Sequence, residues 1–374
     1  MLAVGGGSMG RRRLRDLLAL NVSEVILFEP QPERCAEMAV KFGIRGFTVF
    51  EQALSENPDV MTVSTPPTLH DLYVRQAMER KMHVFAEVPF AFNEKVMESI
   101  AAQAGDYPAV LGISHTLRYY PPYRLIHDML QAGKIGRPLY LEYSLGNYLP
   151  DWHPYEDYRK FYASDYQLGG AGLDMLLHEL AAIQWWLGPV ESVYARFRKL
   201  SDLEIKGPDN HDILLAFESG AQGYFHHDIL EQGTLGRHIR IVGDVGTIEW
   251  HQNQTEIRLY DGATGRARNV PFSEAADWQE ALEASRRMQA ILAQTQAEAG
   301  YVPGGETAPQ YTYESNYLRE MCHFLEAAQG KAPYTMTHVL EELHNVRTFH
   351  AIVQSAQEGR EVGVELQRRS GAER

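Results

Sequence analysis

Cysteine and long apolar segments are both scarce in this sequence. Only two cysteines, Cys35 and Cys322, occur among its 374 residues. They fit neither a disulfide framework nor a metal-ligand spacing, so we expect no bound metal. No apolar run approaches the roughly 20 residues that span a bilayer, and no segment resembles a secretory signal. We therefore expect a cytoplasmic protein with free thiols that does not enter the membrane.

Positive charge is scarce as well. The chain has 35 lysine and arginine residues against 49 aspartate and glutamate residues, a formal net charge of −14. An acidic chain lacks the electrostatic footprint of a nucleic-acid binder, and the short cluster Arg11-Arg12-Arg13 does not change this expectation. Apolar residues make up 44% of the sequence, enough for a sizeable core, and the length predicts two domains.

Short apolar segments alternate with helical ones over the first 115 residues. This alternation predicts a parallel, doubly wound α/β sheet of the Rossmann type with right-handed crossovers. We expect it to form a first domain over residues 1–118. The predicted strands are 2–4, 25–28, 59–64, 83–86 and 110–114, and the predicted helices are 10–20, 32–42, 69–80 and 94–104.

In the second half of the chain, strands follow one another without intervening helices. Such a run predicts a large, mostly antiparallel sheet, here within an α+β domain over residues 119–374. Helices are predicted at 124–132 and 174–187, and residues 300–310 are predicted to be a loop. Whether the last helix packs back on the first domain stays open. The predicted strands are 139–145, 190–199, 212–218, 221–228, 237–242, 247–250 and 255–260, and the final helices are 277–298, 313–328 and 337–358.

A glycine-rich turn separates the first predicted strand from the first predicted helix. Its sequence, Gly5-Gly6-Gly7-Ser8-Met9-Gly10, fits Gly-x-Gly-x-x-Gly. In this motif the first glycine permits a tight turn, the second lets the backbone approach a pyrophosphate, and the third lets helix and strand pack closely. The helix N-terminus then presents free N–H groups to the phosphates. The turn predicts a dinucleotide site, against the alternative of a glycine loop that binds nothing.

An acidic residue stands where the ribose of a dinucleotide would lie. Glu29 ends the second predicted strand, 19 residues beyond Gly10, where a carboxylate can hold both ribose hydroxyls. It would repel a 2′-phosphate and so favours NAD over NADP, although Arg34 keeps NADP as an alternative. Only four residues precede Gly5. Either the sheet accepts a short first strand, or the true start lies upstream of Met1.

A carboxylate and an imidazole are spaced to meet on the helix predicted at 174–187. Asp174 and His178 are four residues apart and share one helix face. A carboxylate can orient an imidazole, which suits a general base that takes a hydroxyl proton as hydride leaves the carbon. The preceding Gly169-Gly170-Ala171-Gly172 can bring the backbone close to a ligand. The alternative is an ordinary pair on a helix surface.

Aromatic and charged side chains gather over residues 152–162. Aromatic faces suit the apolar faces of sugar rings, and arginine suits a carboxylate, phosphate or sulfonate. We expect a substrate role for this segment, against the alternative of a packed surface loop. The residues concerned are Trp152, His153, Tyr155 and Arg159.

Six blocks of sequence are highly specific when taken together. The blocks are Gly5-Gly6-Gly7-Ser8-Met9-Gly10, Ser64-Thr65-Pro66-Pro67-Thr68-Leu69-His70, Glu87-Val88-Pro89, Arg118-Tyr119-Tyr120-Pro121, Gly169-Gly170-Ala171-Gly172-Leu173-Asp174 with His178, and Gly243-Asp244-Val245-Gly246-Thr247-Ile248-Glu249. In this order and spacing they resemble the Gfo/Idh/MocA family of sugar and cyclitol oxidoreductases over nearly the whole chain. The segment 148–159 is similar to family members associated with bacterial sugars of the nonulosonate (sialic-acid-like) type.

The resemblance implies where the reaction occurs and how copies associate. It implies an active site between the sheet of the second domain and the strand ends of the first. It also implies a homodimer or homotetramer, in which such sheets pair face to face. The implied cofactor-binding residues, beside the glycine turn, are Thr65, Pro66, His70, Glu87 and Val88, and the implied catalytic or substrate-binding residues are Arg118, Tyr162, Asp174 and His178.

One position departs from the family pattern. Most members carry Glu-Lys-Pro where this chain has Glu87-Val88-Pro89, and the lysine contacts the hydroxyl that is oxidised and assists proton transfer. Valine has neither charge nor donor. Three interpretations therefore stay open: a dehydrogenase in which His178, with Tyr119 or Tyr162, moves the proton; an NAD-dependent glycosidase that oxidises C3 only transiently; and an NAD-binding protein without catalysis.

Overall fold

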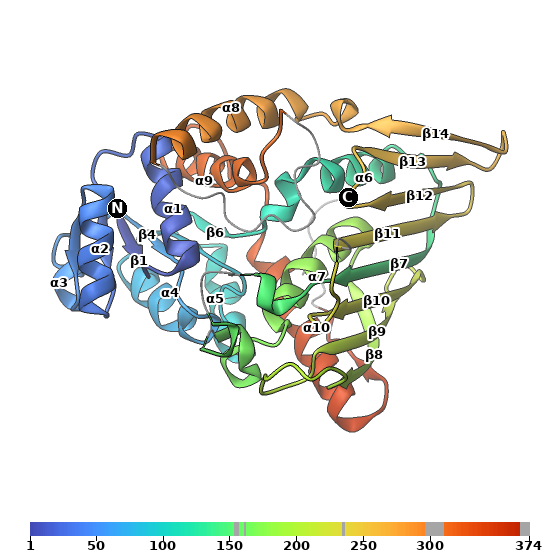
Figure 1. The fold of residues 1–374 in the computed structure, drawn as a ribbon, viewed down its shortest axis with the longest axis horizontal. Coiled ribbons are helices and arrows are strands. Elements are labelled where there is room, and N and C mark those ends of the chain that lie inside the picture. Colours follow the sequence, from blue (N-terminus) through green and yellow to red (C-terminus); the bar gives the residue numbers. More distant parts are fainter. Residues whose placement is uncertain (153–156, 161, 234–235, 296–309, 367–374) are drawn as a thin grey trace. The chain divides into compact units, whose positions relative to one another are not determined.

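The computed structural model describes residues 1–152, 157–160, 162–233, 236–295 and 310–366 (Figure 1). The described residues form two compact units. Unit 1 comprises residues 1–120, 279–295 and 310–342, and unit 2 comprises the described residues between 121 and 278 together with 343–366. Each unit has its own sheet and is described by itself.

Unit 1 contains a six-stranded sheet in which every pairing is parallel. The strand order is β3-β2-β1-β4-β5-β6, that of a dinucleotide-binding Rossmann sheet, so the predicted fold class is confirmed for this unit. The short strand β1 is fully buried and pairs on both sides, with β2 and β4. The strands are β1 (Leu2–Val4), β2 (Ile26–Phe28), β3 (Arg45–Phe47), β4 (Val60–Val63), β5 (His83–Ala86) and β6 (Leu111–Ile113).

Helices connect these strands, and most begin and end within two residues of the predicted bounds. The sequence pattern missed β3 and α3, because β3 is largely exposed and lacks an apolar run. None of the helices in the described part of the chain is both long and apolar enough to cross a membrane. The main helices of this region are α1 (Ser8–Ala19), α2 (Pro32–Phe42), α3 (Phe50–Leu54), α4 (His70–Glu79) and α5 (Glu94–Ala104).

Two later helices belong to unit 1 rather than to the second domain. They are α8 (Trp278–Thr295, from residue 279 on) and α9 (Glu314–Ala328). On α9, Met321 and Phe324 pack in one core cluster with Leu14, Leu27 and Met38, and α9 lies beside α1 (Figure 1). The boundary expected at residue 118 therefore differs from the observed division, because an amphipathic helix does not reveal in its sequence which sheet it will cover.

Unit 2 contains a nine-stranded, mostly antiparallel sheet, as predicted. Its order is β14-β13-β12-β11-β7-β10-β9-β8-β15, and among these pairs only β7 and β10 run parallel. The edge strands β14 and β15 were not predicted: the first is mainly exposed and the second has two residues. The strands are β7 (Pro138–Gly146), β8 (Val190–Arg198), β9 (Asn210–Phe217), β10 (Gln222–Asp228), β11 (Gly236–Gly243), β12 (Gly246–His251), β13 (Glu256–Asp261), β14 (Arg266–Pro271) and β15 (Val362–Gly363).

One face of this sheet is covered by α6 (Pro121–Gln131) and α7 (Leu173–Leu187). Trp186 of α7 packs against Tyr123 of α6 and Tyr143 of β7. A buried carboxylate on α7, Glu179, accepts hydrogen bonds from both tyrosine hydroxyls and from Arg237 of β11, whose Nη2 lies 2.6 Å away. Burying a charge requires such partners, so this cluster fixes α7 on the sheet. The unit also contains α10 (Val339–Glu358) from residue 343 on.

Candidate active site

The glycine turn of unit 1 has a different steric reason for each motif glycine. Gly5 has φ +98°, and a Cβ there would lie 2.6 Å from the carbonyl oxygen of Ser64. A Cβ on Gly10 would overlap the carbonyl oxygen of Gly5, whereas a Cβ on Gly7 would meet nothing within 4 Å. Gly5 and Gly10 are thus required by packing within the chain. Gly7 leaves open space beside the backbone, as a bound pyrophosphate requires.

Helix α1 begins without a side-chain cap in the described part of the chain. Gly7 is the N-cap, no side chain caps the helix, and the first turn, which begins with Ser8 and Met9, contains no acidic residue. Free N–H groups and the helix dipole therefore stay available to an anion.

Glu29 is held rigidly at the end of β2. Its Oε2 accepts from the N–H of Gly6 at 2.8 Å, and its Oε1 accepts from the N–H of Gln31 at 3.0 Å. Arg34 lies farther away, with its Nη1 at 3.7 Å from Oε2. The structure thus places the carboxylate beside the glycine turn, and a ribose-binding role for Glu29 stays a prediction.

The segment after β4 carries the predicted residues Thr65, Pro66 and His70. The imidazole of His70 is buried, with Nε2 at 2.8 Å from the carbonyl oxygen of Thr65 and Nδ1 at 2.7 Å from that of Pro89. His70 therefore joins the turns that follow β4 and β5. The hydroxyl of Thr65 is buried and has no hydrogen-bond partner among the described residues. An unsatisfied buried hydroxyl at the carboxyl edge of a Rossmann sheet fits a dinucleotide ligand.

The turn after β5 is held at its acidic end by an arginine. Glu87 binds Arg13, with Nε 2.7 Å from Oε1 and Nη2 3.2 Å from Oε2. Farther along, the N–H of Phe90 donates to Oε1 of Glu342 at 3.2 Å. Val88 is 3% exposed, and its side chain offers no polar atom. No local sequence pattern indicates that Arg13 is a partner of this turn.

Arg118 lies in unit 1 and is largely buried. Its Nη1 donates to the carbonyl oxygen of Met336, and its Nη2 lies 2.8 Å from Oε2 of Glu341. These contacts hold the guanidinium against the segment before and at the start of α10. A substrate role for Arg118 stays a prediction.

The glycine segment of unit 2 packs against a buried histidine that the sequence analysis missed. Gly172 has φ +83° and is the N-cap of α7, and a Cβ there would overlap the ring of His227 on β10. Burial, and then the neighbouring His211, hold the pKa of His227 well below its usual range. Neither ring nitrogen of His227 has a hydrogen-bond partner in the described part of the chain. A buried histidine on an interior strand has no local motif, so only the fold reveals it.

Of the predicted pair Asp174 and His178 on α7, the structure describes the side chain of His178 only. His178 is half-buried on the second turn of α7. The side chain of Asp174, and residues His153 and Tyr155, lie outside what the structure describes. The pairing of Asp174 with His178 and the roles of the two residues near position 154 therefore stay predictions.

The remaining residues of the aromatic segment have partners within unit 2. Trp152 and Tyr162 pack against a cluster that includes Leu149 and Ile229. The guanidinium of Arg159 lies 2.8 Å from Oδ1 of Asp157 and 3.1 Å from Oε1 of Glu204, and is half exposed. Two carboxylates already balance this cation, so an anionic substrate would have to compete with them.

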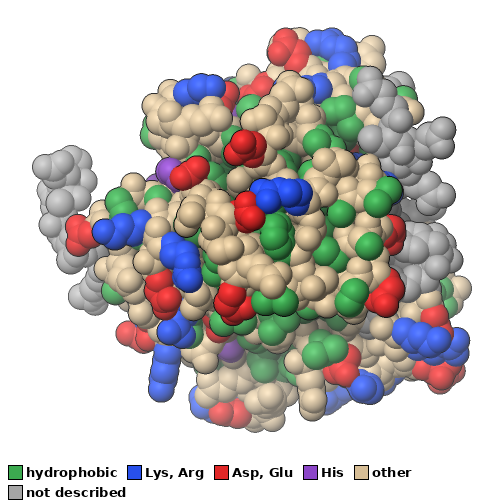
Figure 2. Space-filling model, turned by 90° about the vertical axis from the view of Figure 1, so that its left-hand side faces the viewer, with side chains coloured by type: hydrophobic (Ala, Val, Ile, Leu, Met, Phe, Trp, Pro, Cys, Tyr) green, Lys and Arg blue, Asp and Glu red, His purple; other side chains and the backbone are tan. Residues whose placement is uncertain are grey.

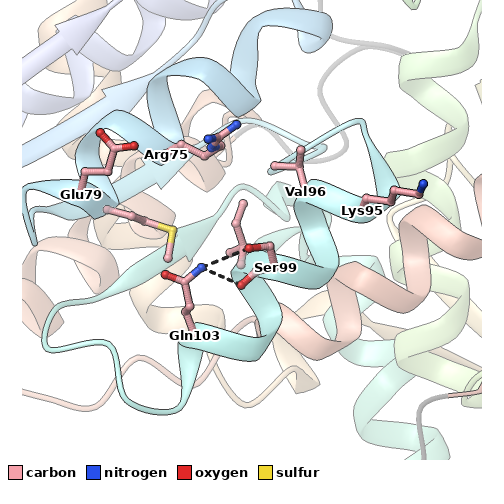
Figure 3. Close-up of a pocket in the computed structure, with 8 residues that line it drawn as sticks. Arg75, Glu79, Lys95, Val96, Ser99 and Gln103 are labelled. Atoms are coloured by element: carbon pink, nitrogen blue, oxygen red, sulfur yellow. Dashed lines mark hydrogen bonds between the residues drawn. The ribbon is translucent and has the colours of Figure 1, made fainter.

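Two further features lie apart from these residues. A groove of about 420 Å³ runs between α4 and α5, and Figure 3 shows Arg75 and Lys95 at its rim. On unit 2, His238, Glu249 and His251 bring potential metal-ligand atoms within 4.8 Å of one another. The two imidazole rings stack face to face, 4.0 Å apart and 6° from parallel, so their in-plane lone pairs do not converge on one ion.

Basic and acidic side chains are mixed on the surface. On the face drawn in Figure 2, lysine and arginine side chains are interspersed with aspartate and glutamate, and the described part of that face shows no continuous basic area.

Comparison with known proteins identifies the fold and its family. Residues 1–115 match the model of an oxidoreductase family with an NAD-binding Rossmann fold, and residues 123–249 match the Gfo/Idh/MocA C-terminal domain. These two models, from one family, cover well over half of the chain. The chain belongs to the Gfo/Idh/MocA oxidoreductase family. The predictions of an NAD-binding Rossmann domain and of family membership are thereby confirmed.

Individual Gfo/Idh/MocA relatives are distant in sequence. The uncharacterized oxidoreductase YrbE of Bacillus subtilis is 25% identical over 226 residues, which are 58% of this chain and only 63% of that relative. Myo-inositol 2-dehydrogenase of Thermotoga maritima is 25% identical over 254 residues, 65% of this chain and 73% of that enzyme. The WlbA dehydrogenase of Bordetella pertussis, solved with NADH and UDP-GlcNAcA, has a TM-score of 0.75 at 19% identity and covers 98% of this chain and 97% of its own. The similarity to the WlbA dehydrogenase shows that the two chains share a fold.

Proposed function

We propose that this chain is an NAD-dependent oxidoreductase that oxidises a hydroxyl of a sugar or sugar derivative, with His178 as the base. The observation that carries the proposal is the glycine turn: Gly7 leaves open space in front of an uncapped helix N-terminus, and Glu29 is fixed beside it. The unsatisfied hydroxyl of Thr65 supplies a further polar contact. Relatives such as myo-inositol 2-dehydrogenase support a polyhydroxylated substrate.

Each group of the chain would then have a defined task. The first turn of α1 would hold the pyrophosphate, and Glu29 the ribose hydroxyls, which favours NAD over NADP. When bound, NAD⁺ accepts the hydride that leaves the sugar carbon. His178 would take the hydroxyl proton, with Asp174 orienting its ring. Arg159 would bind a negatively charged sugar in competition with Asp157 and Glu204.

A second candidate function follows from Val88. Valine stands where most members of the family carry the lysine that assists proton transfer. This buried side chain offers no hydrogen-bond donor. An NAD-dependent glycosidase, which oxidises C3, eliminates the glycosidic substituent, adds water and restores the hydride, uses the cofactor without net redox change. We propose it as the alternative to the dehydrogenase.

The test begins with cofactor titration of purified protein by calorimetry, with NAD⁺ and NADP⁺ in parallel. Protein is then incubated with NAD⁺ and a panel of free, acidic and nucleotide-linked sugars while NADH absorbance is followed. Steady NADH formation supports the dehydrogenase. Cleavage of aryl glycosides without net NADH supports the glycosidase. Tighter binding of NADP⁺ than NAD⁺ overturns the cofactor assignment, and neither reaction across the panel overturns the enzymatic proposal.

A further inference from the structure

Helix α1 carries three largely buried arginines with two different sets of partners. Arg12 and Arg15 both bind Glu314, at 2.8 Å each. Arg13 is fully buried and binds Glu87 and Glu320 instead, with nitrogen–oxygen distances of 2.7 and 2.8 Å. One helix thus makes two separate ionic clusters, and only that of Arg13 includes a residue of the predicted cofactor site.

The guanidinium of Arg13 connects four parts of unit 1. Besides the two glutamates, its Nη2 donates to Oγ of Ser114 at 2.8 Å, directly after β6. Glu87 follows β5, and Glu320 lies on α9. The helix that begins at the glycine turn is therefore tied, through one side chain, to the carboxyl ends of the two strands farthest along the sheet.

Arg13 stays charged in this setting. Burial acts to lower its pKa, but the charges of Glu87 and Glu320 outweigh burial and raise the pKa well above the usual value. A third carboxyl, Asp16, lies 3.6 Å from Nη1. Burial raises the pKa of Asp16 to about 8, so near neutral pH it keeps its proton. The carboxyl groups within hydrogen-bond distance of the guanidinium are those of Glu87 and Glu320.

Stability alone is a poor reason for such a cluster. Moving charged groups out of water costs several kcal/mol per ion, and apolar side chains of similar volume often give equal or greater stability. What a buried ion pair does provide is a fixed direction for each carboxylate. For Glu87 that direction is set at two points, because Arg13 contacts both of its oxygens.

The sheet topology assigns Glu87 to one half of a bound dinucleotide. In a sheet of order β3-β2-β1-β4-β5-β6, each three-stranded half binds one mononucleotide, on either side of the point between β1 and β4. Glu29, directly after β2, belongs to the adenosine half. Glu87, directly after β5, therefore belongs to the nicotinamide half, and its carboxylate is an acceptor suited to the carboxamide NH₂ of nicotinamide.

We propose that Arg13 is a positioning residue for the nicotinamide end of the cofactor, acting through Glu87. It fixes the direction of the Glu87 carboxylate, so that the nicotinamide ring is held in one orientation for hydride transfer. The proposal rests on the proposed function for its catalytic consequence, while its binding consequence needs only NADH.

The experiment compares R13K with R15K on the same helix. Lysine keeps the charge in both variants but cannot form the two-pronged contact with a carboxylate. R15K is the matched control because Arg15 binds Glu314 and not Glu87. The readouts are NADH affinity, the rise in NADH fluorescence on binding, which reports how tightly the nicotinamide is held, and kcat with a sugar found in the panel.

We expect R13K to lose most of the fluorescence rise and about tenfold or more in kcat. NADH affinity should change by less than about threefold, because the contacts to pyrophosphate and adenosine ribose are unaltered. E87Q should show the same pattern, and R13K/E87Q should be no worse than either single variant. R15K should match wild type in all three readouts.

Several outcomes would overturn the proposal. It fails if R13K and R15K behave alike, or if the effects of R13K and E87Q add. If R13K does not fold, E320Q replaces it in the experiment. This variant weakens the contact between Arg13 and α9, and we expect a smaller loss of the NADH fluorescence rise. Failure of the proposed function looks different, because wild type itself would then bind no NADH or oxidise no sugar.

Discussion

The two regions that would hold the reactants, the cofactor side in unit 1 and the substrate side in unit 2, are encoded in different ways. On the cofactor side, the six-residue turn Gly5–Gly10 and Glu29 after the next strand provide most of the proposed contacts to NAD. On the substrate side, Gly172 at the start of α7 packs against the ring of His227, which lies on a strand more than 50 residues farther along the chain. The comparison teaches that backbone-based recognition is local in sequence, whereas side-chain recognition is assembled by the fold.

Among the effects on activity and cofactor binding, the largest is expected at His178 on the substrate side. H178A should lower kcat by about 10²- to 10⁴-fold, because a general base contributes that much, and should leave NAD⁺ affinity unchanged. Steady-state kinetics and calorimetry on the same preparation separate the two. H127A, on α6 of the same unit, is the control. Full activity in H178A would show that His178 is not the general base.

The next effect concerns the open space at Gly7. G7A should weaken NAD⁺ binding by about tenfold or more, because a methyl group would occupy the place of closest backbone approach to the pyrophosphate. Its thermal midpoint should stay that of wild type, since a Cβ there meets nothing within 4 Å. G105A, at another glycine with open space, should affect neither property. Unaltered NAD⁺ affinity in G7A would show that the turn does not hold the cofactor.

A smaller effect is expected at Glu29. E29Q should lose about tenfold in NAD⁺ affinity, because hydrogen bonds to a charged acceptor contribute about 1.5–3 kcal/mol. NADP⁺ affinity should fall less, so that the preference between the two cofactors narrows. E33Q, at an exposed acid in the first turn of α2, is the control for net charge. A preference for NAD⁺ that stays as large as in wild type would contradict the role of Glu29.

The last effect concerns stability rather than activity or binding: a change in its pH dependence at Asp16. Its pKa is raised to about 8 in the folded chain, mainly by burial, from 3.8. The unfolded chain therefore loses this proton first, and between these two values wild type loses stability as pH rises. D16N lacks the titration, so its advantage over wild type should grow by up to about 1.4 kcal/mol per pH unit in that window.

Unfolding of wild type and D16N by urea at pH 5, 6.5 and 8 measures this difference. Parallel stability curves over the three pH values would contradict the buried position assigned to Asp16.

The sequence was most informative where structure is local. The glycine turn, Glu29 and nearly every helix of the first 115 residues follow from spacing and periodicity, because each depends on neighbours within a few positions. The edge strand β14 could not be found, because its side chains are mainly exposed and carry no alternating apolar pattern. The membership of α9 in unit 1 could not be found either, because it depends on Phe324 meeting residues from the opposite end of the chain.

The candidate site shows the same limit. Thr65, His70 and Glu87 were placed by resemblance, and the structure adds what holds them: His70 joins two turns, and Arg13 fixes Glu87. Arg13 had seemed only part of a basic cluster, since nothing in its neighbours along the chain indicates that three carboxyl groups converge on it. His227 had no local signal at all.

The most direct test of the central claim, that this chain moves a hydride between a sugar carbon and nicotinamide, is an isotope transfer. Protein and NAD⁺ are incubated with sugars that carry deuterium on their ring carbons, and the nicotinamide is then analysed for deuterium at C4 by nuclear magnetic resonance. We predict deuterium at C4 with wild type and far slower incorporation with H178A. Nicotinamide that stays free of deuterium with every sugar, in a protein that binds NAD⁺, would contradict the account.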